Sequence, residues 1–285
     1  MTTFKAACVQ VNTSNDMDAN IAAFSDLVRR ARDDGADFIT TPENVSMLEV
    51  GTANLMAKAH PEASHPALAA FRELAAETGA WLLAGSLSVL LDDDKRLANR
   101  QYLIDPAGLV VASYDKIHMF DVDLPNGKSY RESKNYRPGD VARLTPLPWA
   151  MLGMTICYDL RFPHLYRELA QAGAEVLVIP AAFTKLTGQA HWHVLMRARA
   201  IETGCFVIAA AQCGDHAGNR QTFGHSLIVA PWGEVLADGG EAPGVVVADI
   251  DISDVAKARG HVPSLLHDRD YQLAPPSTGI PAAAE

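Results

Sequence analysis

The chain has 285 residues, of which 48% are hydrophobic and 20% are charged, and its formal net charge is −10. Its mean hydropathy of +0.01 is typical of a folded globular protein and excludes general disorder. The negative charge repels a nucleic-acid backbone or an anionic membrane on average, so we expect neither as a partner. The longest uncharged stretch, 144–158, is too short to cross a membrane as a helix.

The N-terminus and the cysteines predict a cytoplasmic protein. The first residues enter a strand-like segment directly, and no basic region followed by an apolar one indicates a signal peptide. The four cysteines form no CxxC pair; they are Cys8, Cys157, Cys205 and Cys213. A chain of this length does not need disulfides to stabilise its core, so we expect reduced thiols.

Short apolar runs alternate with segments whose apolar residues recur at helical spacing. The apolar runs predict strands at 4–11, 38–40, 81–91, 101–104, 109–114, 151–157, 176–182, 206–212, 225–229, 234–237 and 245–250. The helical spacing, with its capping residues, predicts helices from a cap among Asn15, Asp16 and Asp18 to Gly35, from Pro66 to Gly79, and over 163–171, 190–203 and 254–259.

This alternation favours an α/β or α+β fold in which helices cover a central sheet. No change in composition marks a domain boundary. We therefore predict a single domain over 1–272 and a loose tail, rich in proline and alanine, over 273–285.

Several common functional motifs are absent from the sequence. It contains no phosphate-binding GxxxxGK[ST] loop, no GxGxxG, no HExxH, no EF-hand loop and no GxSxG nucleophile elbow. His191 and His193 are the only close histidine pair. On a helix these two side chains point to different faces, so we expect no metal shared by this pair.

Cys157 lies in a context that favours a reactive thiol. It ends the predicted strand 151–157, and a polar turn with Arg161 follows before a helix begins at Pro163. A helix N-terminus and a nearby arginine stabilise a thiolate. Backbone N–H groups of such a turn also point toward an oxyanion. A buried, inert strand cysteine is the alternative.

Two other ionisable residues follow predicted strands in the same way. Glu43 comes after Pro42 at the end of one strand, and Lys116 comes at the end of another. If these strands and that of Cys157 are parallel neighbours, the three side chains emerge along one rim of the sheet, where open α/β sheets bind ligands. A base, a cation and a nucleophile together suit attack on a carbonyl. Taken singly, a surface acid and a solvated lysine are the alternatives.

Three separated motifs carry these residues: Pro-Glu-Asn at 42–44, Asp-Lys-Ile-His at 115–118 and Ile-Cys-Tyr-Asp-Leu-Arg-Phe-Pro at 156–163. In this order they resemble the nitrilase (carbon–nitrogen hydrolase) superfamily, and in particular its Nit branch of small amidases. The resemblance covers nearly the whole chain. It includes Arg-Glu-Ser at 131–133, His-Trp-His at 191–193 and Gly-His-Ser at 224–226.

The resemblance implies a fold and a set of site residues. The fold is a four-layer α-β-β-α sandwich of the α+β class. The site is a catalytic triad of Glu43, Lys116 and Cys157, with Glu132 as a second glutamate. No metal and no organic cofactor are implied, because a thiolate and a fixed cation supply the polarisation.

The resemblance also implies a homodimer or a higher homo-oligomer. Nit-type dimers usually pack through the helix after Cys157, which here carries Leu165, Tyr166 and Leu169. Assembly would then be coupled to the placement of Cys157.

These residues suit covalent hydrolysis of a small-molecule amide. Glu43 accepts the proton of Cys157, and the thiolate attacks the amide carbonyl. Lys116 and the backbone N–H of Tyr158 stabilise the oxyanion. Glu43 then protonates the departing ammonia, and water oriented by Glu43 and Glu132 hydrolyses the thioester.

Other readings use the same residues or the same fold. A nitrilase that makes acids from nitriles, or a carbamoyl hydrolase, would use the same triad. A binding or regulatory protein without catalysis is disfavoured by the intact triad and second glutamate. A glutamine amidotransferase-like hydrolase with a Cys–His pair is disfavoured because bulky Ile156 and Tyr158 flank Cys157.

Within the Nit branch the resemblance leads to two candidate substrates. One group of amidases hydrolyses deaminated glutathione, and a second group, the ω-amidases, acts on keto-acid amides such as α-ketoglutaramate. The stretch 183–193, with Thr-Gly-Gln-Ala-His-Trp-His, resembles the first group more. We therefore expect deaminated glutathione ahead of α-ketoglutaramate.

Both candidate substrates carry carboxylates, so the pocket needs fixed cations or hydrogen-bond donors. Arg161 is the first candidate because its planar guanidinium suits a carboxylate. The hydroxyls of Thr184 and Thr187, and the backbone of Tyr158, are further substrate-binding candidates. A structural ion pair of Arg161 with a nearby acid, Asp159 or Glu168, is the alternative.

Overall fold

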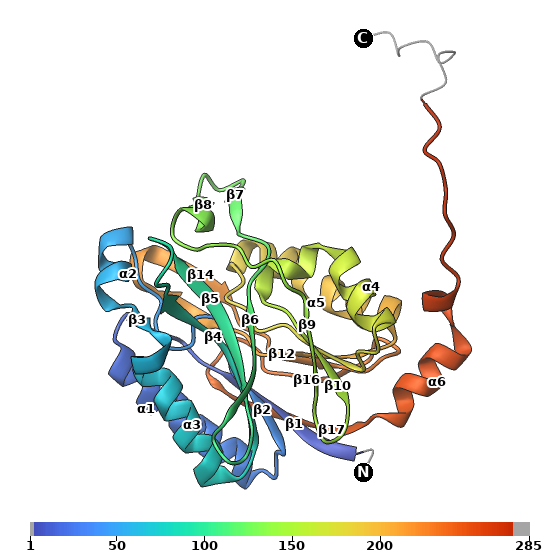
Figure 1. Cartoon of the computed structure of the whole chain (residues 1–285), viewed down its shortest axis with the longest axis horizontal. Helices are drawn as coiled ribbons and strands as arrows, with labels where there is room; N and C mark the ends of the chain where they lie inside the picture. The colour runs from blue at the N-terminus through green and yellow to red at the C-terminus, as the bar shows by residue number, and fades with distance from the viewer. Residues whose placement is uncertain (1–2, 276–285) are drawn as a thin grey trace.

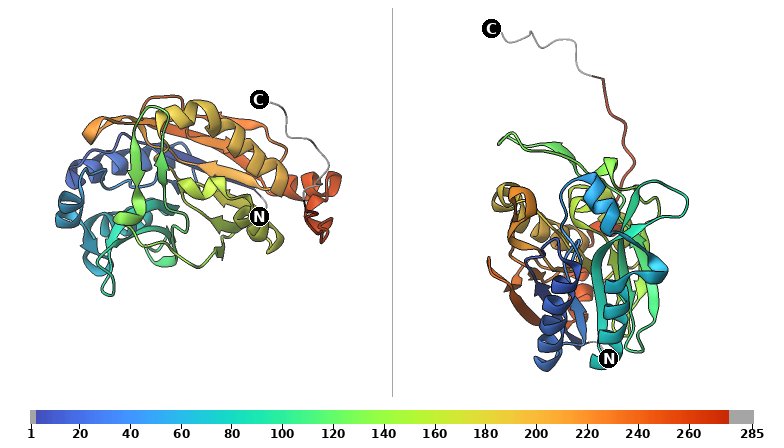
Figure 2. Two further views of the ribbon diagram at one scale, coloured as in Figure 1. Left: turned by 90° about the horizontal axis from the view of Figure 1, so that it is seen from above. Right: turned by 90° about the vertical axis from the view of Figure 1, so that its left-hand side faces the viewer.

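Two sheets packed face to face form the centre of the molecule (Figures 1 and 2). The computed structural model describes residues 3–275. Helices cover the outer face of each sheet, so the layers follow the order helix, sheet, sheet, helix. The α+β sandwich of four layers that the sequence predicts is therefore confirmed.

The first sheet has the strand order β17-β1-β2-β4-β5-β6. Its central strands β1, β2 and β4 are parallel, and β17, β5 and β6 pair antiparallel to their neighbours. A short strand, β3, pairs with β4. The bounds are β1 Thr3–Gln10, β2 Phe38–Thr40, β3 His60–Pro61, β4 Trp81–Leu90, β5 Leu97–Ile104, β6 Val110–Asp115 and β17 Gly244–Asp251.

The second sheet repeats this plan, with the order β16-β15-β12-β11-β10-β9. Here β10, β11 and β12 are parallel, and the flanking strands are antiparallel. The bounds are β9 Arg143–Pro146, β10 Met151–Met154, β11 Val176–Val178, β12 Phe206–Ala209, β15 Leu227–Val229 and β16 Val235–Asp238.

Side chains alternate between two cores along the buried strands. On β1, Phe4, Ala6 and Cys8 face the core between the sheets, whereas Ala7 and Val9 face the core under the helices. Both faces of the strand are covered, so it reads as a continuous apolar run. The two sheets share the inner core, and the single domain expected over 1–272 stays a prediction.

Helices α1 (Met17–Asp33) and α3 (Pro66–Thr78) pack on the first sheet, and α4 (Pro163–Gln171) and α5 (Lys185–Thr203) pack on the second. Their ends follow the predicted signals. Asp16 caps α1 by accepting a hydrogen bond from the Ala19 N–H at 3.1 Å. Gly79 ends α3 in the left-handed conformation, with φ +65°. The remaining helices are α2 (Thr52–Lys58) and α6 (Ser253–His261).

Helix α5 begins five residues before the predicted start at 190. The added turn contains Gly188, which lowers helix propensity and hides the turn from sequence reasoning. The glycine is there because Phe223 lies against it: a Cβ on Gly188 would stand 2.3 Å from the Cβ of Phe223. A tertiary contact therefore outweighs the local preference.

Two hairpins outside the main sheets were not predicted. They are β7 (Asp121–Asp123) with β8 (Ser129–Arg131), and β13 (Cys213–His216) with β14 (Arg220–Phe223). Their strands are short and largely polar, so they lack a period-two apolar pattern. The β7–β8 hairpin projects from one end of the sandwich (Figures 1 and 2).

The chain leaves the body after α6 and the short helical turn Ser264–Leu266 (Figure 2). Residues 267–275 are exposed and form no regular structure. The predicted tail begins at 273, and its part over 276–285 lies outside the described residues. Within residues 3–275, none of the helices combines the length and apolar character that spanning a bilayer requires.

Candidate active site

The three candidate catalytic residues come from both sheets, which corrects the predicted single rim. Glu43 follows β2, and Lys116 follows β6 in the same sheet, with β4 and β5 between them. Cys157 follows β10 of the opposite sheet. The strands are therefore not parallel neighbours. The side chains meet because the two sheets end together, and the site lies between them.

Lys116 is buried, and its ammonium lies between two carboxylates. Its Nζ donates to Glu43 Oε1 at 2.8 Å and to the two oxygens of Glu132 at 2.8 and 3.0 Å. The side chains of Lys116 and Glu43 are 2% and 3% exposed. A buried charge is tolerated only when it is paired and hydrogen-bonded, and this arrangement satisfies both conditions.

Asn99 and two backbone N–H groups fix the carboxylates. Asn99, buried on β5, donates from Nδ2 to Glu43 Oε1 at 2.9 Å and to Glu132 Oε1 at 3.1 Å. The Ala182 N–H donates to Glu43 Oε2 at 2.9 Å, and the Phe120 N–H donates to Glu132 Oε2 at 2.6 Å. Sequence reasoning missed Asn99; a polar side chain beside the predicted strand 101–104 was its only signal.

Cys157 begins a 3₁₀ turn, Cys157–Arg161, in a backbone conformation that non-glycine residues rarely adopt. Its φ is +48°. Its N–H donates to the Pro180 carbonyl at 2.9 Å, which fixes the turn against the segment after β11. Strained conformations of this kind persist where the surroundings determine them and gather at functional sites.

The charges of the site set the protonation of each group. Burial and the Glu43 carboxylate raise the pKa of the Cys157 thiol well above its usual value, so the resting thiol is neutral. Burial works to raise the pKa of Glu43, but the Lys116 ammonium outweighs it and the pKa lies below its ordinary value. Burial likewise disfavours the charged Lys116, yet Glu132 and Glu43 raise its pKa well above 10.5.

Asp159 connects the two chain segments that carry the lysine and the cysteine. Its buried carboxylate accepts from the Tyr114 hydroxyl at 2.7 Å and from the Ile156 N–H at 2.8 Å. It also accepts from the His118 N–H at 3.1 Å and lies 2.7 Å from His118 Nδ1. These partners lie next to Lys116 and Cys157 in the sequence. Asp159 therefore fixes the segment that carries Lys116 against the segment that carries Cys157.

A cavity of about 510 Å³ opens over these side chains. Glu43, Lys116, Glu132 and Cys157 all line it, and so do the predicted binding residues Tyr158, Thr184 and Thr187. Further wall residues are Asn44, Met47, Leu48, Phe120, Lys128, Tyr130, Arg131, Tyr136, Ala182, Phe183 and Arg220. Among the described residues no histidine lines the cavity, which disfavours the Cys–His reading.

Two predicted binding groups differ from expectation. The hydroxyls of Thr184 and Thr187 lie 2.7 Å apart and hydrogen-bond to each other. Arg161 does not line the cavity: its Nη2 lies 3.2 Å from His191 Nδ1, and its guanidinium lies over the Phe183 ring. Its structural partner is thus a histidine of α5 and not the nearby acids considered from the sequence.

Arg220 is the arginine of the cavity wall, and sequence reasoning missed it. It begins β14, and its Nη2 donates to the Ala182 carbonyl at 2.9 Å. Its Nε is buried and has no hydrogen-bond partner within the described part of the chain. The charge of Arg220 also acts on Glu43, whose pKa it helps to lower. A guanidinium with an unused donor, in the wall of the cavity that Cys157 also lines, is suited to an anionic ligand.

Replacing the buried lysine reverses how stability depends on pH. In the wild type, Glu43 contributes stability above its ordinary pKa, and this is lost as the pH falls. In Lys116→Met, the ammonium that outweighs burial is gone, so the pKa of Glu43 rises and stability is lost as the pH rises. We expect a destabilisation of about 3–5 kcal/mol near neutral pH, changing by at most about 1.4 kcal/mol per pH unit.

Thermal unfolding at pH 5 and pH 8 measures this effect. The difference in Tm between wild type and Lys116→Met should be larger at pH 8. Lys257→Met is the matched control, because Lys257 pairs with Asp254 on the surface; its difference should not change with pH. An equal difference for Lys116→Met at both pH values would contradict the buried pairing.

Known proteins resemble this chain over nearly its full length. The carbon–nitrogen hydrolase family matches residues 5–260. A deaminated glutathione amidase of Yersinia enterocolitica is 37% identical over 266 residues, which cover 92% of each chain. The crystal structure of the C. elegans NitFhit protein has a TM-score of 0.87 and 35% identity, and the match covers 94% of this chain and 66% of that one.

A second structure bears on the chemistry of the family. It is a glutamate-to-glutamine mutant of an amidase from Nesterenkonia sp. AN1, in which acrylamide has added to the active-site cysteine. It shares 25% identity and a TM-score of 0.75 with this chain, and the match covers 91% of this chain and 98% of that one. On its match over residues 5–260 and its likeness to these proteins, the chain belongs to the carbon–nitrogen hydrolase family, as an amidase.

Proposed function

We propose that the protein hydrolyses the amide bond of deaminated glutathione through an acyl-enzyme on Cys157. The observation that carries this proposal is the buried Glu43–Lys116–Cys157 cluster at the base of a cavity that also presents the Arg220 guanidinium. The cluster supplies a base, a fixed cation and a nucleophile, and Arg220 supplies a partner for a carboxylate.

Glu43 is the general base of the proposed reaction. Its lowered pKa keeps it ionised near neutral pH, while the raised pKa of Cys157 keeps the thiol protonated. The proton therefore moves from sulfur to Glu43 as the sulfur attacks the amide carbon. A neutral thiol that is deprotonated only during attack is a less reactive target for other electrophiles.

Lys116 and the Tyr158 N–H stabilise the oxyanion. Tyr158 is the second residue of the 3₁₀ turn that Cys157 begins, and the first N–H groups of a helical turn have no partner within it. Lys116 supplies a fixed positive charge that Glu132 and Glu43 hold in place. Losing one such donor typically costs about 10²–10³ in rate. Glu132 acts by positioning Lys116 and by orienting the deacylating water.

The leaving group distinguishes the two candidate substrates. Deaminated glutathione and α-ketoglutaramate share a 2-oxoglutaryl group, so attack at its distal carbonyl gives the same thioester. Ammonia leaves only from α-ketoglutaramate. Deaminated glutathione has no primary amide, so an amine, the cysteinylglycine unit, leaves in place of the ammonia expected from the sequence. Glu43 protonates the departing nitrogen in both cases.

Two cations of the cavity wall suit the two carboxylates of deaminated glutathione. Arg220 lines the same cavity as Cys157, and its guanidinium suits the carboxylate of the 2-oxoglutaryl group. Lys128 is an exposed wall residue in the β7–β8 turn, where its Nζ donates to the Asn219 carbonyl at 2.7 Å. We assign Lys128 to the glycine carboxylate of the leaving group. The cavity of about 510 Å³ lies within the range of about 300–1,000 Å³ typical of small-molecule sites.

Cys157→Ala should abolish hydrolysis, by at least about 10⁴-fold in kcat, without loss of the fold. Glu43→Gln should suppress hydrolysis and also slow the alkylation of Cys157 by iodoacetamide, because the thiol loses its base. Rates of amide cleavage and of alkylation, followed by mass spectrometry, test both. Glu77→Gln, at an exposed glutamate paired with Arg29, is the control. Wild-type alkylation of Glu43→Gln would remove Glu43 as the base.

Substrate preference is tested by comparing kcat/KM for deaminated glutathione, α-ketoglutaramate and an uncharged amide. We expect deaminated glutathione to be the best of the three. Arg220→Gln should lower kcat/KM for both keto acids by about 10- to 100-fold, as expected for loss of a charge-assisted hydrogen bond. Lys128→Gln should affect deaminated glutathione alone, and Arg161→Gln, at a residue outside the cavity wall, is the matched control.

The outcomes separate the alternatives. A clear preference for α-ketoglutaramate would make the protein an ω-amidase. A preference for the uncharged amide would contradict the proposal that the substrate carries carboxylates. A larger loss of kcat/KM in Arg161→Gln than in Arg220→Gln would indicate that Arg161, and not Arg220, binds the substrate carboxylate.

We also propose that the protein forms a homodimer or a higher homo-oligomer. Leu165, Tyr166 and Leu169, to which the sequence points, are buried within the chain and do not face a partner. Exposed apolar side chains lie instead on α5, which packs against α4: Val194 and Ile201, seven residues apart on one face of α5, are 67% and 54% exposed. A second copy would cover these side chains.

Sedimentation at micromolar concentration tests this assembly. The expected mass is at least twice the 30.6 kDa of one chain. Replacing Val194 and Ile201 by glutamate should yield monomers, whereas Leu109→Glu, at another exposed apolar residue, should not. A wild-type mass of one chain would refute the proposal.

The four free, buried cysteines support a reducing compartment, the cytoplasm, as the location.

A further inference from the structure

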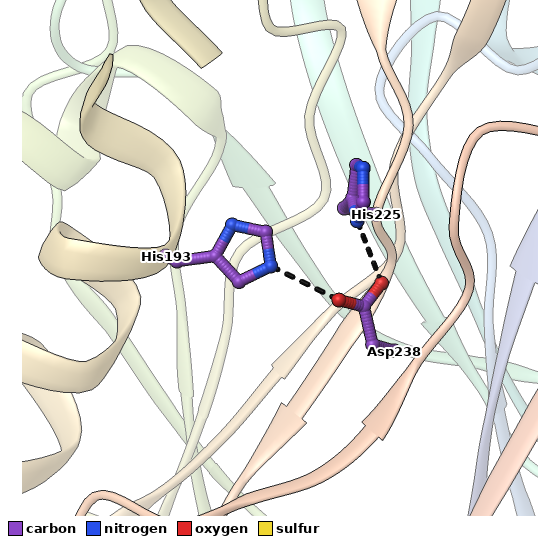
Figure 3. A group of neighbouring side chains, drawn as sticks. All are labelled: His193, His225 and Asp238. Carbon is purple, nitrogen blue, oxygen red and sulfur yellow. Dashed lines mark hydrogen bonds and ion pairs between the residues drawn. The ribbon is translucent and has the colours of Figure 1, made fainter. Parts of the chain in front are cut away.

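His193, His225 and Asp238 form a cluster outside the candidate active site (Figure 3). His193 lies on α5, His225 precedes β15, and Asp238 ends β16. Figure 3 shows the two imidazole rings on either side of one carboxylate. The three residues are far apart in sequence and meet only in the folded chain. Their spacing in the sequence therefore does not predict the cluster.

The geometry brings one ligand atom of each residue into a small volume. His193 Nε2 lies 3.0 Å from Asp238 Oδ2, and His225 Nδ1 lies 2.8 Å from Asp238 Oδ1. The potential ligand atoms all lie within 4.8 Å of one another. The side chains are between 22% and 37% exposed, so an ion can enter and keep water in its open positions.

We propose that these three residues bind a divalent first-row transition metal, with Zn²⁺ as the best match. Two imidazoles and one carboxylate are ligands that Zn²⁺ accepts, at about 2.0–2.2 Å. Neighbouring ligand atoms around such an ion lie about 3.4 Å apart, so the two imidazole–carboxylate separations of 2.8 and 3.0 Å open slightly, and any wider separation, up to 4.8 Å, closes. Ca²⁺ and Mg²⁺ prefer oxygen ligands and do not suit a site with two nitrogens.

The surrounding backbone holds the ligands in place. His225 has a φ of +54°, which is uncommon for a residue with a side chain. Its carbonyl accepts from Trp192 Nε1 at 2.7 Å, next to His193 on α5. The Gly240 N–H donates to Asp238 Oδ1 at 2.9 Å, and such second contacts orient ligating carboxylates. The site is thus supported from both the helix and the strand side.

A bound ion would link α5, through His193, to the segment before β15 and to the end of β16, through His225 and Asp238. Phe223 stacks on His225 with ring centroids 4.4 Å apart and packs against Gly188 of α5. The same segment ends β14, which begins at Arg220 in the cavity wall. The ion takes no part in the reaction. Its role is to stabilise the packing of α5 on β14 and β15, because a ligand that binds only the folded state stabilises it.

His191 provides a matched control on the same helix. It lies two residues before His193 and points away from the cluster, toward Arg161. His191→Gln therefore changes a histidine of the same motif without touching the proposed ligands. His193→Gln and Asp238→Asn each remove one ligand, and His193 is a partly exposed helix residue that tolerates glutamine.

The experiment uses the full chain, stripped of metal with a chelator and then titrated with Co²⁺ and Zn²⁺. We expect one Co²⁺ per chain, with visible absorption bands and no thiolate charge-transfer band, and a rise in Tm on addition of Zn²⁺. Both responses should persist in His191→Gln and in Cys157→Ala. His193→Gln and Asp238→Asn should bind the metal more weakly by at least about tenfold.

Three results would overturn the proposal. They are the absence of saturable Co²⁺ binding in the wild type, equal binding by His193→Gln and His191→Gln, and a thiolate band that disappears in Cys157→Ala. The last would place the metal at the candidate active site. Because binding and Tm are measured without substrate, the outcome does not depend on the proposed amidase activity. If Asp238→Asn fails to fold, His193→Gln alone decides.

Discussion

The buried ammonium of Lys116 is the interaction on which the site depends. It is hydrogen-bonded to Glu43 and Glu132, and it keeps the pKa of Glu43 low although burial acts in the opposite direction. Without it, two carboxylates would face each other in a desolvated space. The same charge that stabilises the resting site is available for an oxyanion, so one residue serves both the fold and the proposed chemistry.

This cluster needs two sheets to assemble it, and a few buried polar contacts align them. Asn99 of the first sheet bonds both carboxylates, and Asp159, after the second sheet, bonds the segment that leads to Lys116. The Ala182 N–H, also from the second sheet, reaches Glu43. Each contact joins segments that are far apart in the sequence. Disturbing the packing of the sheets would therefore misplace the base, the cation and the nucleophile together.

Local signals in the sequence predicted much of this structure and stopped where tertiary contacts decide. The bounds of α3 follow from Pro66 and Gly79, because these residues act on their own backbone. Glu43, Lys116 and Cys157 could be identified because each ends a strand within a recognisable motif. Which sheet each strand joins could not be predicted, since apolar runs look alike in both sheets. Asn99 and Arg220 were missed for the same reason: only the folded chain brings them to the site.

Arg161 and Arg220 differ in where the fold places them relative to the cavity. Arg161 is four residues from Cys157 in sequence, yet it turns away to His191. Arg220 is far away in sequence and lies in the cavity wall, on a hairpin that belongs to neither main sheet. Lys128 and Tyr130 come from the other small hairpin. The sheets thus hold the proposed reacting groups, and the two hairpins line the cavity beside them. Such hairpins can vary without disturbing the buried cluster, which is how one set of reacting groups serves different amides on one fold.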